Sequence, residues 1–347
     1  MSFKKFSIYS LVVFFATFCV LLCGFSFLKR TKVEAPVHVV SEYSTVQNNL
    51  WCVTFQLVWN ELSEKFVKGP VNFVGGNPQI ADELNKKLYT ADILSEKSYY
   101  TTFGKVSKKL KKQIEKTIKK KFNETSDLLD MVNWNAKNSY LFYSILKKNF
   151  TFLVPFDKLA NAPFNSSKEL VKYFGINENS DKKLRDNVTV LFYNSPDEYA
   201  VKLNTNEKEN VILFRTDNEY SFVENFDYVL ANSDEDKFSK KDTLLIPDMD
   251  VNKTISYNEL AGRQIENTNY VISQALQTIQ FKLDNKGGSL KSEAIITVMK
   301  TSLMPEVEEP RHFLFDKPFV LFLIEEGKDK PYYAMKVENT DFLVSEK

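Results

Sequence analysis

The sequence is poor in the residues that build metal sites, disulfides and nucleophilic active sites. It contains two histidines, His38 and His312, and three cysteines, of which only Cys52 lies outside an apolar N-terminal run. No intrachain disulfide can form outside that run, and no histidine-based metal site is expected. The motifs CxxC, HExxH, GxSxG, GxGxxG and the Walker loop are missing, and the neighbouring carboxylates Asp248 and Asp250 have no positioned partner. We therefore expect no metal, no cofactor and no enzymatic activity.

Glycine and proline are also scarce, with 10 and 11 residues in a chain of 347. This scarcity argues against long disordered or collagen-like tracts. A hydrophobic content of 43 % supports a real core, which 29 phenylalanines and 16 tyrosines make aromatic. The formal net charge is +1, so any affinity for polyanions must come from a local patch. The length allows one large domain or two ordinary ones.

A long run without charge stands near the N-terminus. Residues 8–28 are 21 uncharged residues. A helix of that length spans about 31 Å, close to the hydrocarbon thickness of a bilayer. We predict a tail at 1–7, a transmembrane signal anchor at 8–28, a tether at 29–48 and a folded, extracytoplasmic domain at 49–347. A removed signal peptide or a lipid on Cys23 stays open as an alternative.

Before residue 135 the apolar residues recur at helical spacing. We predict a helix that begins at Asn48 and ends at Gly69-Pro70, because its large apolar residues recur at intervals of three and four. A short strand at Val71–Val74 and a second helix at Pro78–Leu88 follow. The apolar residues of the first helix are Trp51, Phe55, Val58, Trp59, Leu62 and Phe66, and we interpret both tryptophans as core.

Residues 105–122 contain nine lysines and one glutamate. Leu110, Ile114 and Ile118 recur every four residues, which predicts an amphipathic helix with a strongly basic outer face. The candidate contact residues on that face are Lys108, Lys109, Lys112, Lys116, Lys119, Lys120 and Lys121. This face is either a solvated surface or a contact for an anionic polymer or lipid. We expect no nucleic acid partner, because no aromatic platform is interleaved with the lysines.

After Asn135 short apolar runs bounded by Asn, Asp, Gly or Pro predict strands. They are Tyr140–Phe150, Asn187–Tyr193, Tyr199–Leu203, Val211–Thr216, Thr243–Ile246, Ala275–Leu283, Phe319–Ile324 and Tyr332–Val337. A charged hairpin, residues 325–330, joins the last two. Because helices come first, mixed strands later, and no βαβ repeat is present, the predicted fold class is α+β.

The C-terminal end resembles the closing strand pair of the serpin family. The residues that carry this likeness are Phe315–Ile324, the charged hairpin, and Tyr332–Val337 followed by Asn339. Ile272–Ala294 resembles the strand that enters the serpin hinge and reactive loop. Weaker matches in family order are Ile114–Trp134, like the helix across the main sheet, Leu141–Asp157, like its central strand, and Leu244–Pro247, like a later strand.

These matches cover most of residues 50–340, with departures. The part before Ile114 is shorter than in the family, and Ser144, Phe152 and Met335 stand where the family has Asn, Trp and Gly. The resemblance implies a serpin-like fold of N-terminal helices and mixed or antiparallel sheets with an exposed reactive-type loop.

The resemblance also implies a protease inhibitor whose partner is a serine or cysteine protease. In this family the protease cuts an exposed loop, whose N-terminal half inserts as a strand into the main sheet and carries the acylated protease along. Here the loop is 289–312, its hinge is Gly287 and Gly288, and family spacing places the cut bond at Thr301–Ser302 or Lys300–Thr301.

Insertion requires that alternate side chains fit the core. Beyond the hinge, Gly288, Leu290, Ser292, Ala294 and Ile296 share the inward face, and Ser289, Lys291, Glu293 and Ile295 share the outward face. The family's inhibitors carry small residues here, and a leucine in a slot made for alanine costs about 1–3 kcal/mol unless the core has adapted.

Two alternatives therefore stay open. In the first, the protein is a non-inhibitory serpin-like surface or scaffold protein whose lysine-rich helix contacts anionic polymers or lipid. In the second, the glycine pair is a simple turn or bulge between two strands and not a hinge.

Overall fold

The computed structural model describes residues 49–291 and 310–346. Over these two ranges, no helix is both long and apolar enough to cross a bilayer. The predicted anchor at 8–28 and the tether at 29–48 lie outside the described residues, and both stay predictions.

The largest sheet has seven strands and places the last two predicted strands side by side, between β1 and β9. Its order is β1-β17-β16-β9-β8-β7-β10, and all neighbours are antiparallel. The strands are β1 (Asn49–Cys52), β7 (Val188–Ser195), β8 (Glu198–Asn204), β9 (Glu209–Arg215), β10 (Asp236–Lys237), β16 (Phe319–Glu325) and β17 (Tyr333–Val337). Every residue of β16 is buried, which explains why this strand reads as one continuous apolar run.

A four-stranded sheet lies beside it, in the order β15-β11-β6-β5. Its strands are β5 (Asp157–Pro163), β6 (Leu170–Ile176), β11 (Thr243–Pro247) and β15 (His312–Leu314). Only β11 and β15 are parallel. Since β15 begins at His312, the last residue of the predicted loop, this sheet holds the C-terminal end of that loop.

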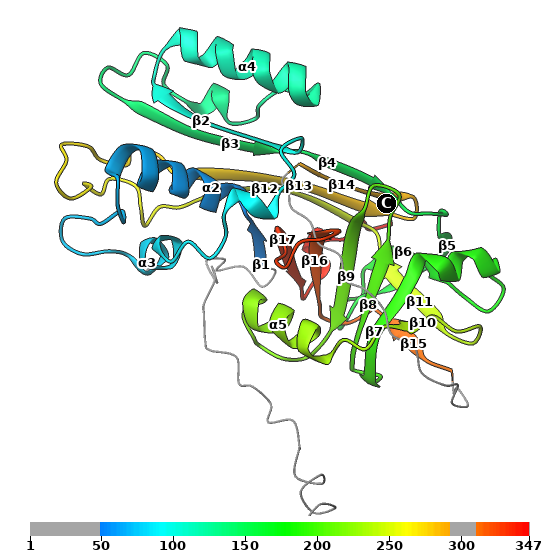
Figure 1. Cartoon of the computed structure of the whole chain (residues 1–347). Helices are drawn as coiled ribbons and strands as arrows, with labels where there is room; N and C mark the ends of the chain where they lie inside the picture. Colours follow the sequence, from blue (N-terminus) through cyan, green and yellow to red (C-terminus); the bar gives the residue numbers. More distant parts are fainter. Residues whose placement is uncertain (1–48, 292–309, 347) are drawn as a thin grey trace, which may run out of the picture. The chain divides into compact units, whose positions relative to one another are not determined.

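The remaining strands form what we call the main sheet. One part has the order β12-β13-β14-β4 and the other is the pair β2-β3, all antiparallel. The strands are β2 (Tyr99–Lys105), β3 (Tyr140–Leu146), β4 (Lys148–Thr151), β12 (Met249–Ser256), β13 (Leu276–Asp284) and β14 (Gly287–Lys291). Because only Lys147 separates β3 from β4, the two parts are joined through one long, interrupted strand (Figure 1).

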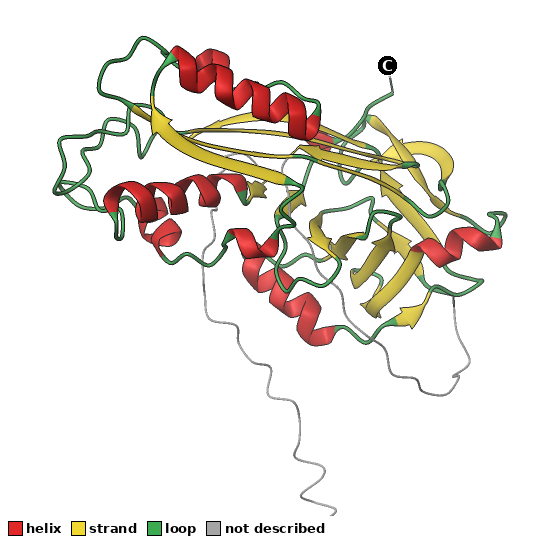
Figure 2. Ribbon diagram, turned by 45° about the horizontal axis from the view of Figure 1, so that its top comes forward, coloured by secondary structure: helices red, strands yellow, loops and turns green. Residues whose placement is uncertain are grey.

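Helices cover both faces of the β2-β3 pair. Helix α4 (Lys108–Phe122) packs on one face, and α2 (Thr54–Glu61), which continues as a π-helical segment at Leu62–Val67, lies on the other (Figure 2). The other helices are α3 (Gln79–Asn85) and α5 (Phe222–Asn232), with short 3-10 turns at Ala91–Ile93, Leu129–Met131, Lys182–Asn187 and Thr340–Phe342.

The lysine-rich helix forms where its sequence pattern predicts. The Ser107 hydroxyl accepts a hydrogen bond from the Leu110 N–H at 3.2 Å and caps the N-terminus. Asn123 ends the helix in a left-handed conformation, φ +55°. The fully buried Ile114 and Ile118 hold its inner face against β3.

The α+β class is confirmed, but several element predictions were wrong. The first helix begins at Thr54 instead of Asn48, because residues 49–52 pair with β17 as a strand. Val71–Val74 is no strand; within it only Phe73 forms an isolated bridge, to Ile265. Strands β2, β5, β6, β10, β12 and β15 and helix α5 were not predicted, so strands and helices alternate more than the sequence indicated.

Candidate functional site

The strand that leads to the glycine pair is half-buried, as its alternation predicts. Ile279, Phe281 and Leu283 of β13 are buried, whereas Lys282 is exposed. These inward side chains belong to the main core, so their packing holds β13 in place in the main sheet.

A tight turn at Asn285 and Lys286 joins β13 to β14. The Asn285 side-chain amide donates to the Phe156 carbonyl at 3.0 Å, and the Phe152 N–H donates to the Lys286 carbonyl at 2.9 Å. These bonds attach the turn to the chain that follows β4. The turn precedes the glycine pair, and both glycines lie in the strand itself.

Both glycines are required by the close approach of the flanking strands. Gly288 lies opposite Leu283 of β13 on one edge and Phe150 of β4 on the other. A Cβ on Gly287, whose φ is +149°, would lie 2.2 Å from the Phe150 carbonyl oxygen. A Cβ on Gly288 would lie 2.5 Å from the Phe150 ring and 2.8 Å from the Lys282 carbonyl oxygen. Residues with a side chain therefore cannot enter here without displacing a neighbouring strand.

The next residues of β14 point to opposite faces of the sheet. Leu290 is fully buried and belongs to the main core. Lys291 points to the outer face, where its Nζ binds the Asp127 carboxylate at 2.9 Å and the Thr125 carbonyl at 3.1 Å. This is the alternation that the sequence analysis assigned to these two residues.

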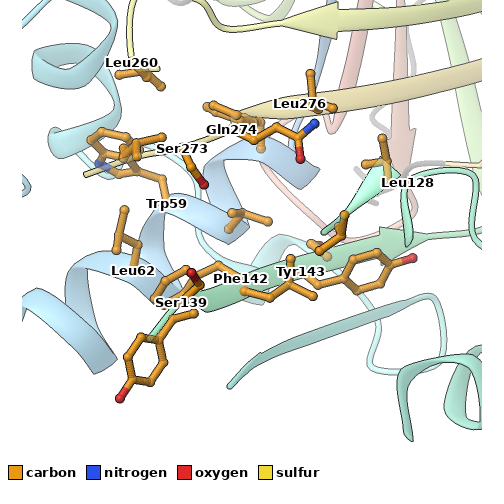
Figure 3. Close-up of a pocket in the computed structure, with 18 of the residues that line it drawn as sticks. Trp59, Leu62, Leu128, Ser139, Phe142, Tyr143, Leu260, Ser273, Gln274 and Leu276 are labelled. Carbon is orange, nitrogen blue, oxygen red and sulfur yellow. The ribbon is translucent and has the colours of Figure 1, made fainter. Parts of the chain in front are cut away.

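A groove begins where β14 ends. Within the two described ranges, β13 pairs with β12 and β14 but not with β3. A cavity of about 1270 Å³ lies between β3 and β13. Figure 3 shows Trp59 and Leu62 on its α2 side, Phe142 and Tyr143 of β3 along one wall, and Leu276 of β13 opposite. The main sheet is thus split along the line of β14.

The floor of the groove carries polar groups. Gln277 donates to the Cys52 carbonyl at 3.0 Å and to the Thr54 hydroxyl at 2.7 Å, and accepts from the Tyr257 hydroxyl at 2.7 Å. The Ser144 hydroxyl is buried with no hydrogen-bond partner in the described part of the chain. A buried polar group without a partner is uncommon in folded proteins, so this position favours an additional polar neighbour.

The chain that follows α4 borders the outer side of the groove. Ser126, Asp127 and Leu128 line it. The Tyr143 hydroxyl donates to Ser126 Oγ at 3.1 Å, and burial raises the pKa of Tyr143 to about 12. Together with the Lys291–Asp127 ion pair, this bond connects both the β3 wall of the groove and the end of β14 to the same segment.

The predicted basic face is present on the exposed side of α4. Six lysines of α4 are exposed and form no ion pair with a described residue, whereas Lys121 donates to the carbonyls of Glu96 and Tyr99. At 100° per residue, the six fall within an arc of about 120°. They are Lys108, Lys109, Lys112, Lys116, Lys119 and Lys120, which we call the lysine stripe.

The candidate reactive bond at Lys300, Thr301 and Ser302 lies outside the described residues and stays a prediction. The end of the loop is firmly held at Arg311. Its guanidinium binds the Asp242 carboxylate at 2.8 Å and the Asp236 carboxylate at 2.9 Å. Since the Asp242 side chain is fully buried, Arg311 is fixed at the point where the chain enters β15 of the four-stranded sheet.

Sequence reasoning missed a buried ionic cluster beneath β14. Lys148 of β4 contacts Glu209 of β9 and Glu325 of β16, and the three side chains are 10 %, 2 % and 1 % exposed. The one feature of the sequence that points to this cluster is a charged residue next to an apolar run, such as Glu325 after Phe319–Ile324. The residues are 61 and 177 positions apart, so their contact depends on the fold.

No protein-family model matches the chain, and no curated protein matches its sequence. Solved structures do match. The structure described as cleaved Serpin 42Da is 10 % identical, covers 85 % of this chain and 92 % of its own, and has a TM-score of 0.51. A tumour-suppressing serpin matches with 11 % identity, 84 % and 92 % coverage and a TM-score of 0.49. Serpin48 of the insect Tenebrio molitor matches with 12 % identity, 84 % and 91 % coverage and a TM-score of 0.45.

The chain therefore has a divergent serpin fold, and the predicted resemblance is confirmed at the level of the fold. At this identity the likeness concerns the arrangement of helices and strands. What the chain does has to be argued from its own groove and strands.

Proposed function

We propose that this protein inhibits a serine or cysteine protease by inserting the N-terminal part of its loop, residues 289–312, into the groove of the main sheet. The observation that carries the proposal is β14. This strand already pairs with β13 on one side and with β4 on the other. The groove lies directly beyond its end, between β13 and β3, where a longer strand would fit.

The register of β14 supports this proposal. Continued by antiparallel pairing, it would place Ser292 opposite Leu146 and Ile279, and Ala294 opposite Ser144 and Gln277. Small side chains would then meet the inner floor of the groove. A new strand would also bring backbone polar groups near the buried Ser144 hydroxyl, which has no hydrogen-bond partner among the described residues.

Leu290 was the main objection from the sequence, because the family's inhibitors carry small residues here. The core accommodates it completely, since Leu290 is 0 % exposed within β14. The overpacking expected of a leucine therefore does not oppose the first step of insertion. In this proposal the anchor at 8–28 tethers the inhibitor outside the cytoplasm.

The first test is exposure to a protease that cuts after lysine. We expect an SDS-resistant complex, and cleavage at Lys300–Thr301 should raise the Tm of the chain. The rise should be several degrees, because each kcal/mol of stability gained moves Tm by about 2–4 °C in domains of about 150–250 residues. Cleavage at residues 295–305 with neither a complex nor a shift in Tm would contradict inhibition and favour a non-inhibitory binding protein.

The lysine stripe favours a second function, contact with an anionic lipid surface. Six exposed lysines that form no ion pair within the described part of the chain lie along one side of α4, and the apolar residues 8–28 would keep this domain close to a membrane. Clustered lysines near an anionic surface contribute about 1 kcal/mol each.

The second test compares binding of the full chain, held in neutral-lipid nanodiscs, to vesicles with and without phosphatidylserine. Changing Lys112, Lys116 and Lys120 to Glu should weaken binding to the anionic vesicles about a hundredfold. A variant with Lys182, Lys183 and Lys240 changed to Glu alters the net charge equally and should bind like the wild type. Binding to soluble polyphosphate but not to vesicles would assign the stripe to an anionic polymer instead.

A further inference from the structure

The buried ionic cluster joins the main sheet to the seven-stranded sheet. We call Lys148, Glu209 and Glu325 the carboxylate staple. Lys148 Nζ lies 2.6 Å from a Glu325 carboxylate oxygen and also contacts Glu209 directly. The two glutamates are neighbours across β9 and β16, at the end of their paired segment. A single lysine of β4 thus holds two carboxylates of the sheet below.

The staple is balanced in charge only when one carboxylate carries a proton. The titratable or charged groups that face Glu209 are Lys148 from β4, Glu325 from β16 and Tyr332, whose hydroxyl donates at 3.3 Å. The Ser95 N–H lies 3.4 Å from one oxygen of Glu325, and the other oxygen is buried without a partner among the described residues. With both carboxylates ionised, the cluster carries one uncompensated negative charge, which is costly in a buried site.

The staple lies at the point where the groove begins. The backbone of Lys148 pairs with Leu290, the penultimate residue of β14. Its side chain points inward to the carboxylates, while Lys291 points outward to Asp127. Any motion of β4 away from the sheet below would therefore also disturb the edge on which β14 is paired.

We propose that Lys148 and Glu209 are positioning residues that hold β4 on the seven-stranded sheet. Through the staple, this attachment of β4, and with it the pairing of β14 with β4, is weaker at neutral pH than at mildly acidic pH. The proposal rests on the geometry of the uncleaved chain. Only its extension to loop insertion depends on the proposed inhibitory function.

The direction of this pH dependence follows from the protonation of Glu209. Burial, with Glu325 adding to it, raises the pKa of Glu209 to about 7, against the opposing effect of Lys148. A carboxyl whose pKa is higher in the closed state than in the open state stabilises the closed state at low pH. That stabilisation is lost as the pH rises towards about 7, and little further change follows above it.

The experiment is amide hydrogen exchange on the full, uncleaved chain, followed in peptides that contain residues 148–151 and 287–291. After correction for intrinsic exchange, we expect protection to fall about tenfold between pH 5.5 and pH 7.5. Glu209→Gln should remove this dependence. Glu325→Gln, which also leaves one carboxylate for one lysine, should reduce it and serves if the first variant does not fold.

Lys148→Arg keeps the charge and should retain the dependence. The matched control is Glu326→Gln, which removes an exposed carboxylate one residue along and should behave like the wild type. Protection that does not change with pH in the wild type, or an unaltered dependence in both Gln variants, would overturn the proposal. Because no protease is used, that outcome would leave the inhibitory function to be judged by its own test.

Discussion

Replacing Gly287 or Gly288 by valine is expected to abolish the pairing of β14 with β4. At Gly287 the first added carbon would lie 2.2 Å from a backbone carbonyl oxygen, and a backbone atom cannot rotate away as a side chain can. Relief requires either that β4 shifts or that β14 leaves the sheet. We expect a loss of about 1–3 kcal/mol in the free energy of unfolding, as for other overpacked sites, measured by urea denaturation.

Under the proposed inhibitory function, the same variants should reduce the yield of SDS-resistant complex at least about tenfold. Delayed insertion of the strand would give the protease time to complete hydrolysis. Two glycine controls separate a steric clash from backbone strain and from a general effect of replacing glycine. Gly69→Ala meets nothing within 4 Å, and Gly262→Ala meets nothing within 4 Å but has a φ of +79°. Full complex formation by Gly287→Val would show that β14 does not need its place beside β4.

Replacing Lys148 by methionine should destabilise the chain by about 3–5 kcal/mol at neutral pH, the usual cost of leaving buried charge without its partner. Glu209 and Glu325 would remain side by side, 2 % and 1 % exposed, with no opposite charge from β4. The deficit should shrink at about pH 5. Protonation neutralises a carboxyl whose pKa is raised, so the folded form regains stability as the pH falls.

The control for this variant is Lys147→Met. Lys147 pairs with Glu124 on the partly exposed outer side, where the two side chains are 21 % and 30 % exposed. An ion pair of that kind contributes about 0–1 kcal/mol. Equal losses in urea denaturation for the two variants would mean that the staple carries no more than an ordinary surface pair.

Local periodicity predicted several elements correctly. The four-residue spacing of Leu110, Ile114 and Ile118 predicted α4, and the two-residue alternation around Phe281 predicted β13. The continuous apolar run at Phe319–Ile324 predicted a strand, which the structure forms over Phe319–Glu325. Each of these patterns depends only on which face of an element is buried, so a short window of residues contains the information.

Long-range pairing is what misled the first helix prediction. The large residues near Trp51 fit a helical stripe, yet residues 49–52 form a strand because the edge of β17 is available to them. Strand β6 was missed because its partners β5 and β11 lie on separate stretches of the chain. Strand propensity depends on such neighbours, which a local pattern does not contain.

The amino-acid sequence by itself determined the α+β class, the lysine-rich helix and the glycine pair after an alternating strand, because all three follow from neighbouring residues. Only the tertiary structure decided that β14 lies between β13 and β4, that a groove continues its line, and that Lys148 meets Glu209 and Glu325. These features join residues far apart in the chain, and they exist only where strands from separate regions pack side by side.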